Sequence, residues 1–143
     1  MPVSTEDYVS VSDFLGRYCW RVDEGDEEGW AALWTADGHF EGATPVPLTG
    51  REALKAVPRG VRQNNDRRLR HMIGSLHCDY AAGDRDTVVA RYYNLVTHWP
   101  AGGQLVCMAV CTATLRRHRD GEQGDGEQGS GWLMARNEVF NLV

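Results

Sequence analysis

The stretch that decides the fold is RYCWRVDEGD, residues 17–26. Apolar residues recur in and before it at three- and four-residue steps, the spacing of one buried helix stripe: Phe14, Leu15, Tyr18, Cys19 and Val22. Asp23 lies at the end of this stripe, beside Tyr18. A carboxylate in this position is either a solvated residue at a helix end or an acid/base group that faces a cavity. Because most Asp residues are exposed, the helix alone favours the solvated interpretation, and the remaining residues have to decide.

Length and charge limit what the chain can bind. Its 143 residues predict one domain, residues 1–143, large enough to bury a core and still enclose a pocket. The net charge of -5 argues against nucleic acid or an anionic membrane as a partner and favours a small neutral or apolar ligand. No apolar run approaches the roughly 18 residues of a membrane span, and the first residues lack the features of a signal peptide. We therefore expect a cytoplasmic protein.

Three helices are expected in the first part of the chain. The first begins between Ser4 and Ser10 and runs to about Val22. The second is short and ends at residues 37–38, and its apolar face consists of Trp30, Leu33 and Trp34.

The third helix is expected to begin at a capping box formed by Thr49 and Glu52 and to stop at Pro58. The arginine-rich residues 59–70 then predict a solvated connection.

From Leu69 onward the sequence alternates between apolar and polar residues and is rich in β-branched and aromatic side chains. Turn signals at residues 81–84, 101–103 and 120–131 divide it into four long strands in hairpin order. Residues 120–129 repeat Asp-Gly-Glu-Gln-Gly twice, which predicts a floppy, polar hairpin tip without catalytic meaning. Short helices followed by a meander of strands predict an α+β fold in which the helices cover one face of a curved sheet.

His71 is predicted to face a ligand cavity. A turn centred on residues 82–83 would pair residues whose numbers sum to 165, which places His71 opposite Asn94. His71 then shares a face with the even-numbered residues of the next strand: Val88, Ala90, Tyr92, Asn94, Val96 and His98. Apolar walls with a few polar groups are typical of small-molecule sites.

The chain offers no convincing metal site. His71 and His77 have the same parity but stand about 20 Å apart along one strand, too far to share an ion. The four cysteines lack metal or disulfide spacing and are expected to be reduced. We therefore expect no metal and no organic cofactor.

Taken in order, several segments resemble the SnoaL-like branch of the nuclear transport factor 2 (NTF2) fold, which includes polyketide cyclases, ketosteroid isomerase, scytalone dehydratase and bile-acid 7α-dehydratase. The resemblance spans almost the whole chain and rests on these segments: Tyr18 to Asp23, Trp30 to Gly38, Leu48 to Leu54, and Arg70-His71. It implies a cone-shaped, curved mixed β-sheet wrapped around three N-terminal helices, with an apolar central cavity.

The resemblance also implies a site. Dehydratases of the family use a tyrosine and an aspartate on the first helix and a histidine on the first long strand, which match Tyr18, Asp23 and His71. Where some members have a second acid that orients the histidine, this chain has Asn94, which can bond an imidazole but cannot stabilise its cation. An arginine on the last strand is matched by Arg136. The remaining candidate substrate-binding residues are His98, Trp34 and Tyr92.

These residues suit enolisation, in which a base removes a proton next to a carbonyl and a donor holds the developing oxyanion. We expect a cofactor-independent dehydratase or cyclase for a hydrophobic, polyketide- or steroid-like carbonyl compound, with either Asp23 or His71 as the base. A double-bond isomerase using the same residues is the nearest alternative. A non-enzymatic small-molecule binding protein and a protein-interaction module are the others.

The outer sheet face predicts self-association. It is expected to carry two apolar rows, Val89, Tyr93, Leu95 and Trp99 on one strand and Leu105, Cys107, Ala109, Cys111, Ala113 and Leu115 on the next. Monomers rarely expose such a surface, so we expect a homodimer, with a homotrimer as the alternative.

Overall fold

The computed structural model describes residues 1–65, 68–125 and 129–142. Four helices, a 3-10 turn and six strands follow one another along the described chain: α1 (Thr5–Asp23), α2 (Glu27–Ala31), β1 (Trp34–Glu41), β2 (Leu48–Thr49), α3 (Arg51–Leu54), α4 (Ala56–Asn65), β3 (Leu69–Ala81), β4 (Asp84–His98), η1 (Pro100–Gly102), β5 (Gln104–Arg117) and β6 (Trp132–Asn141).

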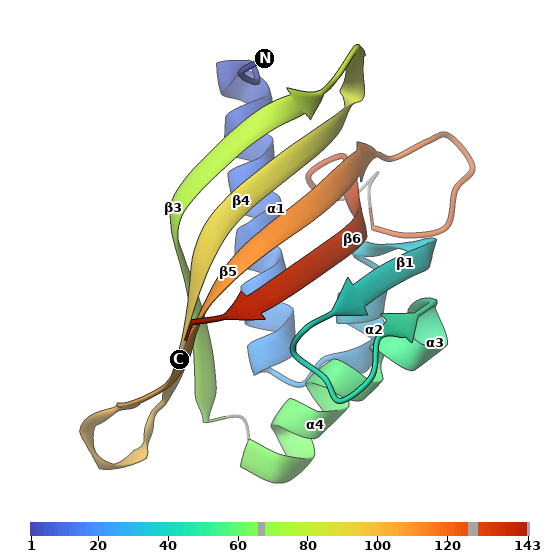
Figure 1. The fold of residues 1–143 in the computed structure, drawn as a ribbon. Coiled ribbons are helices and arrows are strands. Elements are labelled where there is room, and N and C mark those ends of the chain that lie inside the picture. Colours follow the sequence, from blue (N-terminus) through green and yellow to red (C-terminus); the bar gives the residue numbers. More distant parts are fainter. Residues whose placement is uncertain (66–67, 126–128, 143) are drawn as a thin grey trace.

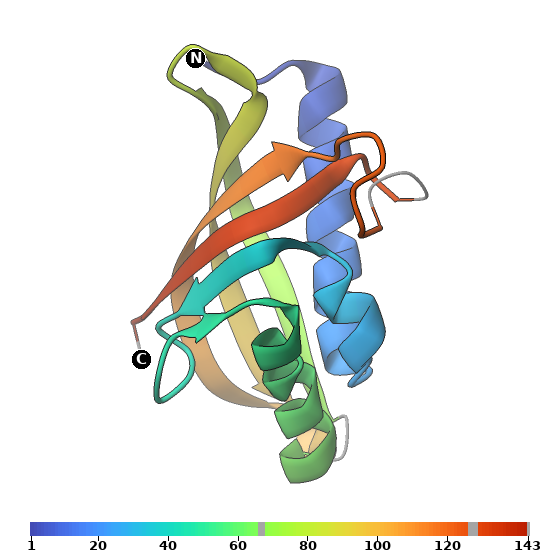
Figure 2. The same ribbon diagram turned by 90° about the vertical axis from the view of Figure 1, so that its right-hand side faces the viewer.

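The strands form one curved, unclosed sheet in the order β2-β1-β6-β5-β4-β3 (Figure 1). The sheet is mixed, because β1 runs parallel to β6 while the other neighbours are antiparallel. The helix α1 lies across its concave face, and α2, α3 and α4 gather at one end of α1 (Figure 2). The α+β class and the curved mixed sheet expected from the sequence are confirmed.

Helix α1 forms as its sequence predicts. The Ser4 side chain caps it by accepting a hydrogen bond from the backbone N–H of Asp7, and the helix ends at Asp23. The predicted stripe is buried against the sheet, with Phe14 fully inaccessible. Gly25 then turns the chain with a φ of 70°, and Asp26 caps α2. Asp23 is therefore fixed where α1 stops.

The second helix is shorter than predicted. It ends at Ala31, and Trp34 begins β1, so Asp37 and Gly38 lie within a strand and not at a helix end. A Cβ added at Gly38 would meet the Trp34 ring at 2.7 Å. This glycine therefore permits close packing in a strand, a role that cannot be distinguished from a turn signal by sequence alone.

The predicted capping box and the stop at Pro58 are both wrong. Helix α3 has Gly50 at its N-cap, without a side-chain hydrogen bond, so Thr49 does not cap it. Pro58 is the third residue of α4, where a helix needs no N–H donor, and the helix continues to Asn65. Much of the predicted solvated connection is therefore helical.

His71 lies opposite Val96 and not opposite Asn94, which pairs with Ile73. The parity nevertheless holds, because the even-numbered residues of β4 are the buried ones from Val88 to Val96. A bulge follows at Ser75, a non-glycine residue with a φ of 52°, and reverses the parity of the rest of β3. His77 therefore pairs with Arg91 on the outer face and does not share the face of His71.

The predicted outer face is right on β4 and, apart from the exposed Leu105, wrong on β5. Val89 pairs with Thr114 and Tyr93 with Val110, so odd residues of β4 share a face with even residues of β5. The odd row of β5 is consequently internal: Cys107, Ala109, Cys111, Ala113 and Leu115.

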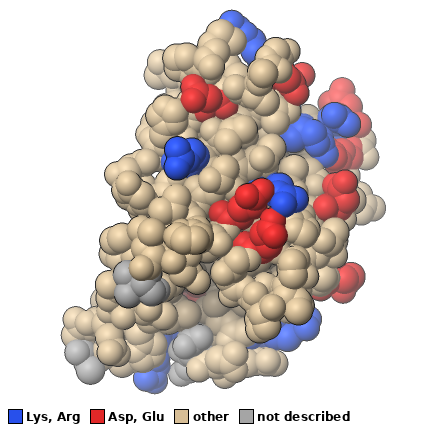
Figure 3. Space-filling view, in the orientation of Figure 1, with Lys and Arg blue, Asp and Glu red and all other residues tan. Residues whose placement is uncertain are grey.

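The outer face still exposes large apolar side chains, and Figure 3 shows broad uncharged areas on this side of the molecule. These side chains are Met72, Tyr93, Leu105 and Phe140.

The described part of the repeated segment is anchored and does not form a floppy tip. Glu122 pairs with Arg116 at 2.5 Å, and Asp125 pairs with Arg21 of α1 at 2.7 Å. Arg51 also donates a hydrogen bond to the Gln123 carbonyl. The glycine-rich composition therefore conceals fixed polar contacts with the helices.

Candidate active site

Asp23 and His71 form a two-point contact where α1 ends against the start of β3. The imidazole Nδ1 of His71 lies 2.6 Å from Asp23 Oδ1, and the backbone N–H of His71 donates to Asp23 Oδ2 at 3.1 Å. A carboxylate has only acceptors, so Nδ1 carries a proton, and in the neutral form of the ring Nε2 presents its lone pair. The Asp23 side chain is 5% exposed, and His71 lies between it and a cavity.

The cavity has a volume of about 370 Å3, within the usual range of small-molecule sites. The sheet, α1 and α4 all contribute walls. Most of the lining is apolar, including Val22, Trp30, Phe40, Val57, Val61, Leu69, Val96 and Val139. Its polar groups include Tyr18, His71, Asn94 and Asn137. The structure thus brings Tyr18 and His71 to one cavity, with Asp23 behind the imidazole.

Tyr18 presents a hydroxyl proton at the cavity wall. The Nδ2 of Asn137 donates to the Tyr18 hydroxyl at 3.1 Å and to the Tyr92 hydroxyl at 3.2 Å. The Tyr92 hydroxyl also bonds the Cys111 thiol. Among the described residues Tyr18 has no acceptor of its own, so its proton is free to bond a ligand in the cavity.

Burial keeps the Tyr18 hydroxyl protonated. It raises the pKa of Tyr18 well above 10, and the hydrogen bond from Asn137 offsets this only in part. The ring packs on Trp30, with centroids 5.2 Å apart, and on Trp34 at 6.3 Å. Tyr18 is therefore a rigidly held neutral donor.

The other predicted residues lie at different distances from this centre. Asn94 lines the cavity, but its Oδ1 has no hydrogen-bond partner among the described residues. Asp23 occupies the place beside the imidazole that was assigned to Asn94 from the sequence. Tyr92 is buried behind Asn137, and Trp34 is fully buried in the aromatic cluster, so neither lines the cavity. His98 lies at the end of β4, outside the lining.

Arg136 is also outside the cavity. Its parity on β6 places it on the outer face, where it pairs with Glu41 and Glu138 and its side chain is 46% exposed. Sequence reasoning assigned an arginine of the last strand to the site, but the neighbouring Asn137 is the β6 residue that faces inward.

Three features of the cavity were missed in the sequence. Asn137 is a buried polar residue between charged neighbours, and strand alternation could have identified it. The α4 wall was hidden because Pro58 was interpreted as a helix stop. Cys107 lines the cavity because the parity of β5 is the reverse of the predicted one.

Within residues 1–65, 68–125 and 129–142, no group of three or more His, Cys, Asp or Glu side chains is arranged to hold a metal ion. In the same residues no helix is long and apolar enough to cross a membrane.

Comparisons with known proteins identify the family and the fold of the chain. A family model described as a SnoaL-like domain matches residues 3–136. No curated protein matched the sequence.

Solved structures share the fold. An NTF2-like protein with a cystatin-like fold from Novosphingobium aromaticivorans is 24% identical, with a TM-score of 0.78 over 96% of this chain and 82% of that one. Aln2 from a Streptomyces species is 26% identical, with a TM-score of 0.82 over 99% of this chain and 94% of Aln2. A scytalone dehydratase-like protein, also from N. aromaticivorans, is 18% identical, with a TM-score of 0.67 over 95% of this chain and 84% of that protein.

Proposed function

The chain belongs to the SnoaL-like domain family, and from this membership we propose that it is a cofactor-independent acid/base enzyme. Its reaction is the enolisation of a hydrophobic carbonyl compound, completed as a dehydration or a cyclisation. Family membership and fold support an enzymatic or ligand-binding role at the coarser level. The finer assignment rests on the site residues of this chain.

The observation that carries the proposal is the two-point contact between Asp23 and His71 at the cavity wall. His71 is the base: its Nε2 removes a proton from the carbon next to the substrate carbonyl. Asp23 orients the ring and stabilises the imidazolium that forms, as a carboxylate does for a catalytic histidine. General bases of this kind contribute about 10²- to 10⁴-fold in rate.

Tyr18 is the acid partner. As the base withdraws the proton, negative charge develops on the carbonyl oxygen, and the Tyr18 hydroxyl donates a hydrogen bond to it. Loss of one such preorganised donor costs about 2.7–4 kcal/mol of transition-state stabilisation. Asn137 is a positioning residue, because its amide fixes the hydroxyl and leaves the proton of Tyr18 directed away from itself.

The test uses a model ketone, because enolisation can be observed without the natural substrate. 1-Tetralone is incubated with the protein in D2O, and NMR follows the loss of its α-proton signal. We expect wild-type protein to accelerate exchange and the His71→Gln and Tyr18→Phe variants to lose most of that acceleration. The matched control is His77→Gln, on the same strand but facing outward with a side chain 70% exposed.

Exchange that is equally fast in His71→Gln and wild type would contradict the assigned base. Ketone binding without any exchange would favour a ligand carrier instead. Once a natural substrate is known, product analysis separates elimination or ring closure from double-bond migration, the reaction of an isomerase with the same residues.

A further inference from the structure

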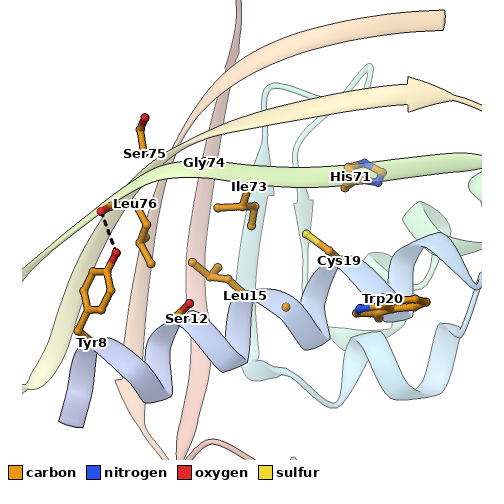
Figure 4. Close-up of a pocket in the computed structure, with 11 residues that line it drawn as sticks. Tyr8, Ser12, Leu15, Cys19, Trp20, His71, Ile73, Gly74, Ser75 and Leu76 are labelled. Carbon is orange, nitrogen blue, oxygen red and sulfur yellow. Dashed lines mark hydrogen bonds between the residues drawn. The ribbon is translucent and has the colours of Figure 1, made fainter. Parts of the chain in front are cut away.

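A groove runs along the surface between α1 and β3, on the side of His71 away from the cavity lining (Figure 4). Its volume is about 460 Å3. The helix wall repeats at four-residue steps through Tyr8, Ser12, Gly16 and Trp20. The hollow exists because the two middle residues are small: a Cβ added at Gly16 would meet nothing within 4 Å.

His71 belongs to the walls of both spaces. Its side chain lines the internal cavity with Tyr18 and Asn94, and it also lines the groove with Cys19 and Trp20. Figure 4 shows the imidazole above these two helix residues at one end of the groove. His71 is therefore shared between the apolar cavity and a space open to water.

This arrangement matters for a base in a closed site. After the reaction the imidazolium must give its proton to the product or to water. A substrate that fills an apolar cavity excludes water from that side. Nδ1 is occupied by Asp23, so any exchange with water occurs at Nε2. The groove is open to solvent along its length, and Ser12 of the helix wall can bind water within it.

We propose that the groove between α1 and β3 is a separate water access to His71, through which water reaches the Nε2 edge of the imidazole and takes its proton without entering by way of the cavity. In this step the Nε2–H bond of the imidazolium breaks and the proton passes to a water molecule in the groove. The role of the groove in proton release rests on the proposed function, whereas the access of water to His71 through the groove can be tested without it.

Diethyl pyrocarbonate tests the access, because it acylates the free nitrogen of a neutral histidine. Peptide mass spectrometry measures the labelling rate of His71 relative to the exposed His77 in the same sample. Trp20→Ala removes part of the groove wall at a residue that is 67% exposed, and we expect labelling of His71 to become several-fold faster. Gly16→Phe fills the groove, and we expect labelling to become several-fold slower. Gly16→Ala is the control with the smallest added side chain.

Gly60→Phe is the matched variant for the cavity: it obstructs the cavity as Gly16→Phe obstructs the groove. Gly60 is also a helical glycine, it lines the cavity, and its added Cβ would meet only Asn64, at an ordinary 3.7 Å. Unchanged labelling in Gly60→Phe together with slower labelling in Gly16→Phe supports the proposal. Slower labelling in Gly60→Phe with no change in Gly16→Phe overturns it, because His71 is then reached through the cavity.

Folding and catalysis are controlled separately. Thermal unfolding identifies a variant that fails to fold, and Gly16→Leu replaces Gly16→Phe in that case. Labelling requires no turnover, so a protein without ketone exchange can still show the access, and an active protein can lack it.

Discussion

Replacing Asp23 by Asn should reverse the tautomer of His71 and so remove the base without removing the residue. In the native site Asp23 accepts from two donors of His71, the ring Nδ1 and the backbone N–H. An asparagine has one acceptor oxygen. If that oxygen keeps the backbone N–H, the amide N–H₂ faces Nδ1, which must then become an acceptor. The ring proton moves to Nε2, the atom that should receive the substrate proton.

The size of the effect follows from the hydrogen bond that is lost. Hydrogen bonds with one charged partner contribute about 1.5–3 kcal/mol of net stabilisation. At 1.36 kcal/mol per factor of ten in rate, the loss of imidazolium stabilisation alone predicts about a 10- to 150-fold slower α-proton exchange. Folding should change little, because the amide retains a hydrogen bond in the same place and no unpaired charge is left buried.

Nitrogen-15 NMR of the imidazole distinguishes the tautomers, and the 1-tetralone assay measures the rate. Asp13→Asn is the matched control, since Asp13 lies on the same helix, has a side chain 54% exposed and pairs with Arg17. We expect both readouts to be unchanged in the control. An Asp23→Asn protein that keeps the proton on Nδ1 and exchanges at the native rate would refute the orienting role of Asp23.

Three further expectations concern stability, assembly and metal. Burial raises the pKa of Asp7, but hydrogen bonds from Arg117 and Tyr80 outweigh burial and hold the pKa below its usual 3.8. The stability that Asp7 contributes is therefore present above pH 3.8 and is lost as the pH falls below it. In urea unfolding, the difference in the free energy of unfolding between wild type and Asp7→Asn should become smaller in acid. Light scattering should give twice the 16.0 kDa of one chain, and Phe140→Glu, which charges an outer-face residue 68% exposed, should give monomer; a native monomer would contradict this. Ketone exchange should survive a chelator, and full loss restored by one divalent ion would disprove metal independence.

Local signals predicted the first helix and its end near Asp23 correctly. The stripe through Phe14 and Val22 has a strong period, and Ser4 and Gly25 mark the helix ends by ordinary capping and turn chemistry. The parity of His71 was predicted correctly because two irregularities of the β3–β4 pairing cancel. The register shifts between Tyr80 and Ala81 and again between Gly74 and His77, which restores at His71 the parity that the turn alone predicts. The catalytic roles of Tyr18, Asp23 and His71 stay predictions until exchange is measured.

The predictions that were wrong, for the second half of β3, for β5 and for α4, depend on single irregular residues. The bulge at Ser75 reverses half of β3, yet serine carries no sequence signal for a positive φ. The parity of β5 depends on the conformation of residues 99–103 and on a second register shift between Val96 and Thr97. Pro58 looked like a stop because its place within the first turn of α4 depends on where that helix begins.

The position of Cys107 makes the cavity addressable by covalent chemistry. Its thiol lines the cavity, whereas Cys19, Cys78 and Cys111 are buried, and burial raises the pKa of the Cys107 thiol, so alkylation should be slow near neutral pH and faster in mild alkali. A library of disulfide-bearing fragments could therefore be tethered to Cys107, with Cys107→Ser as the blank. The fragments retained by non-covalent contacts would outline the shape and polarity of the natural substrate before its identity is known.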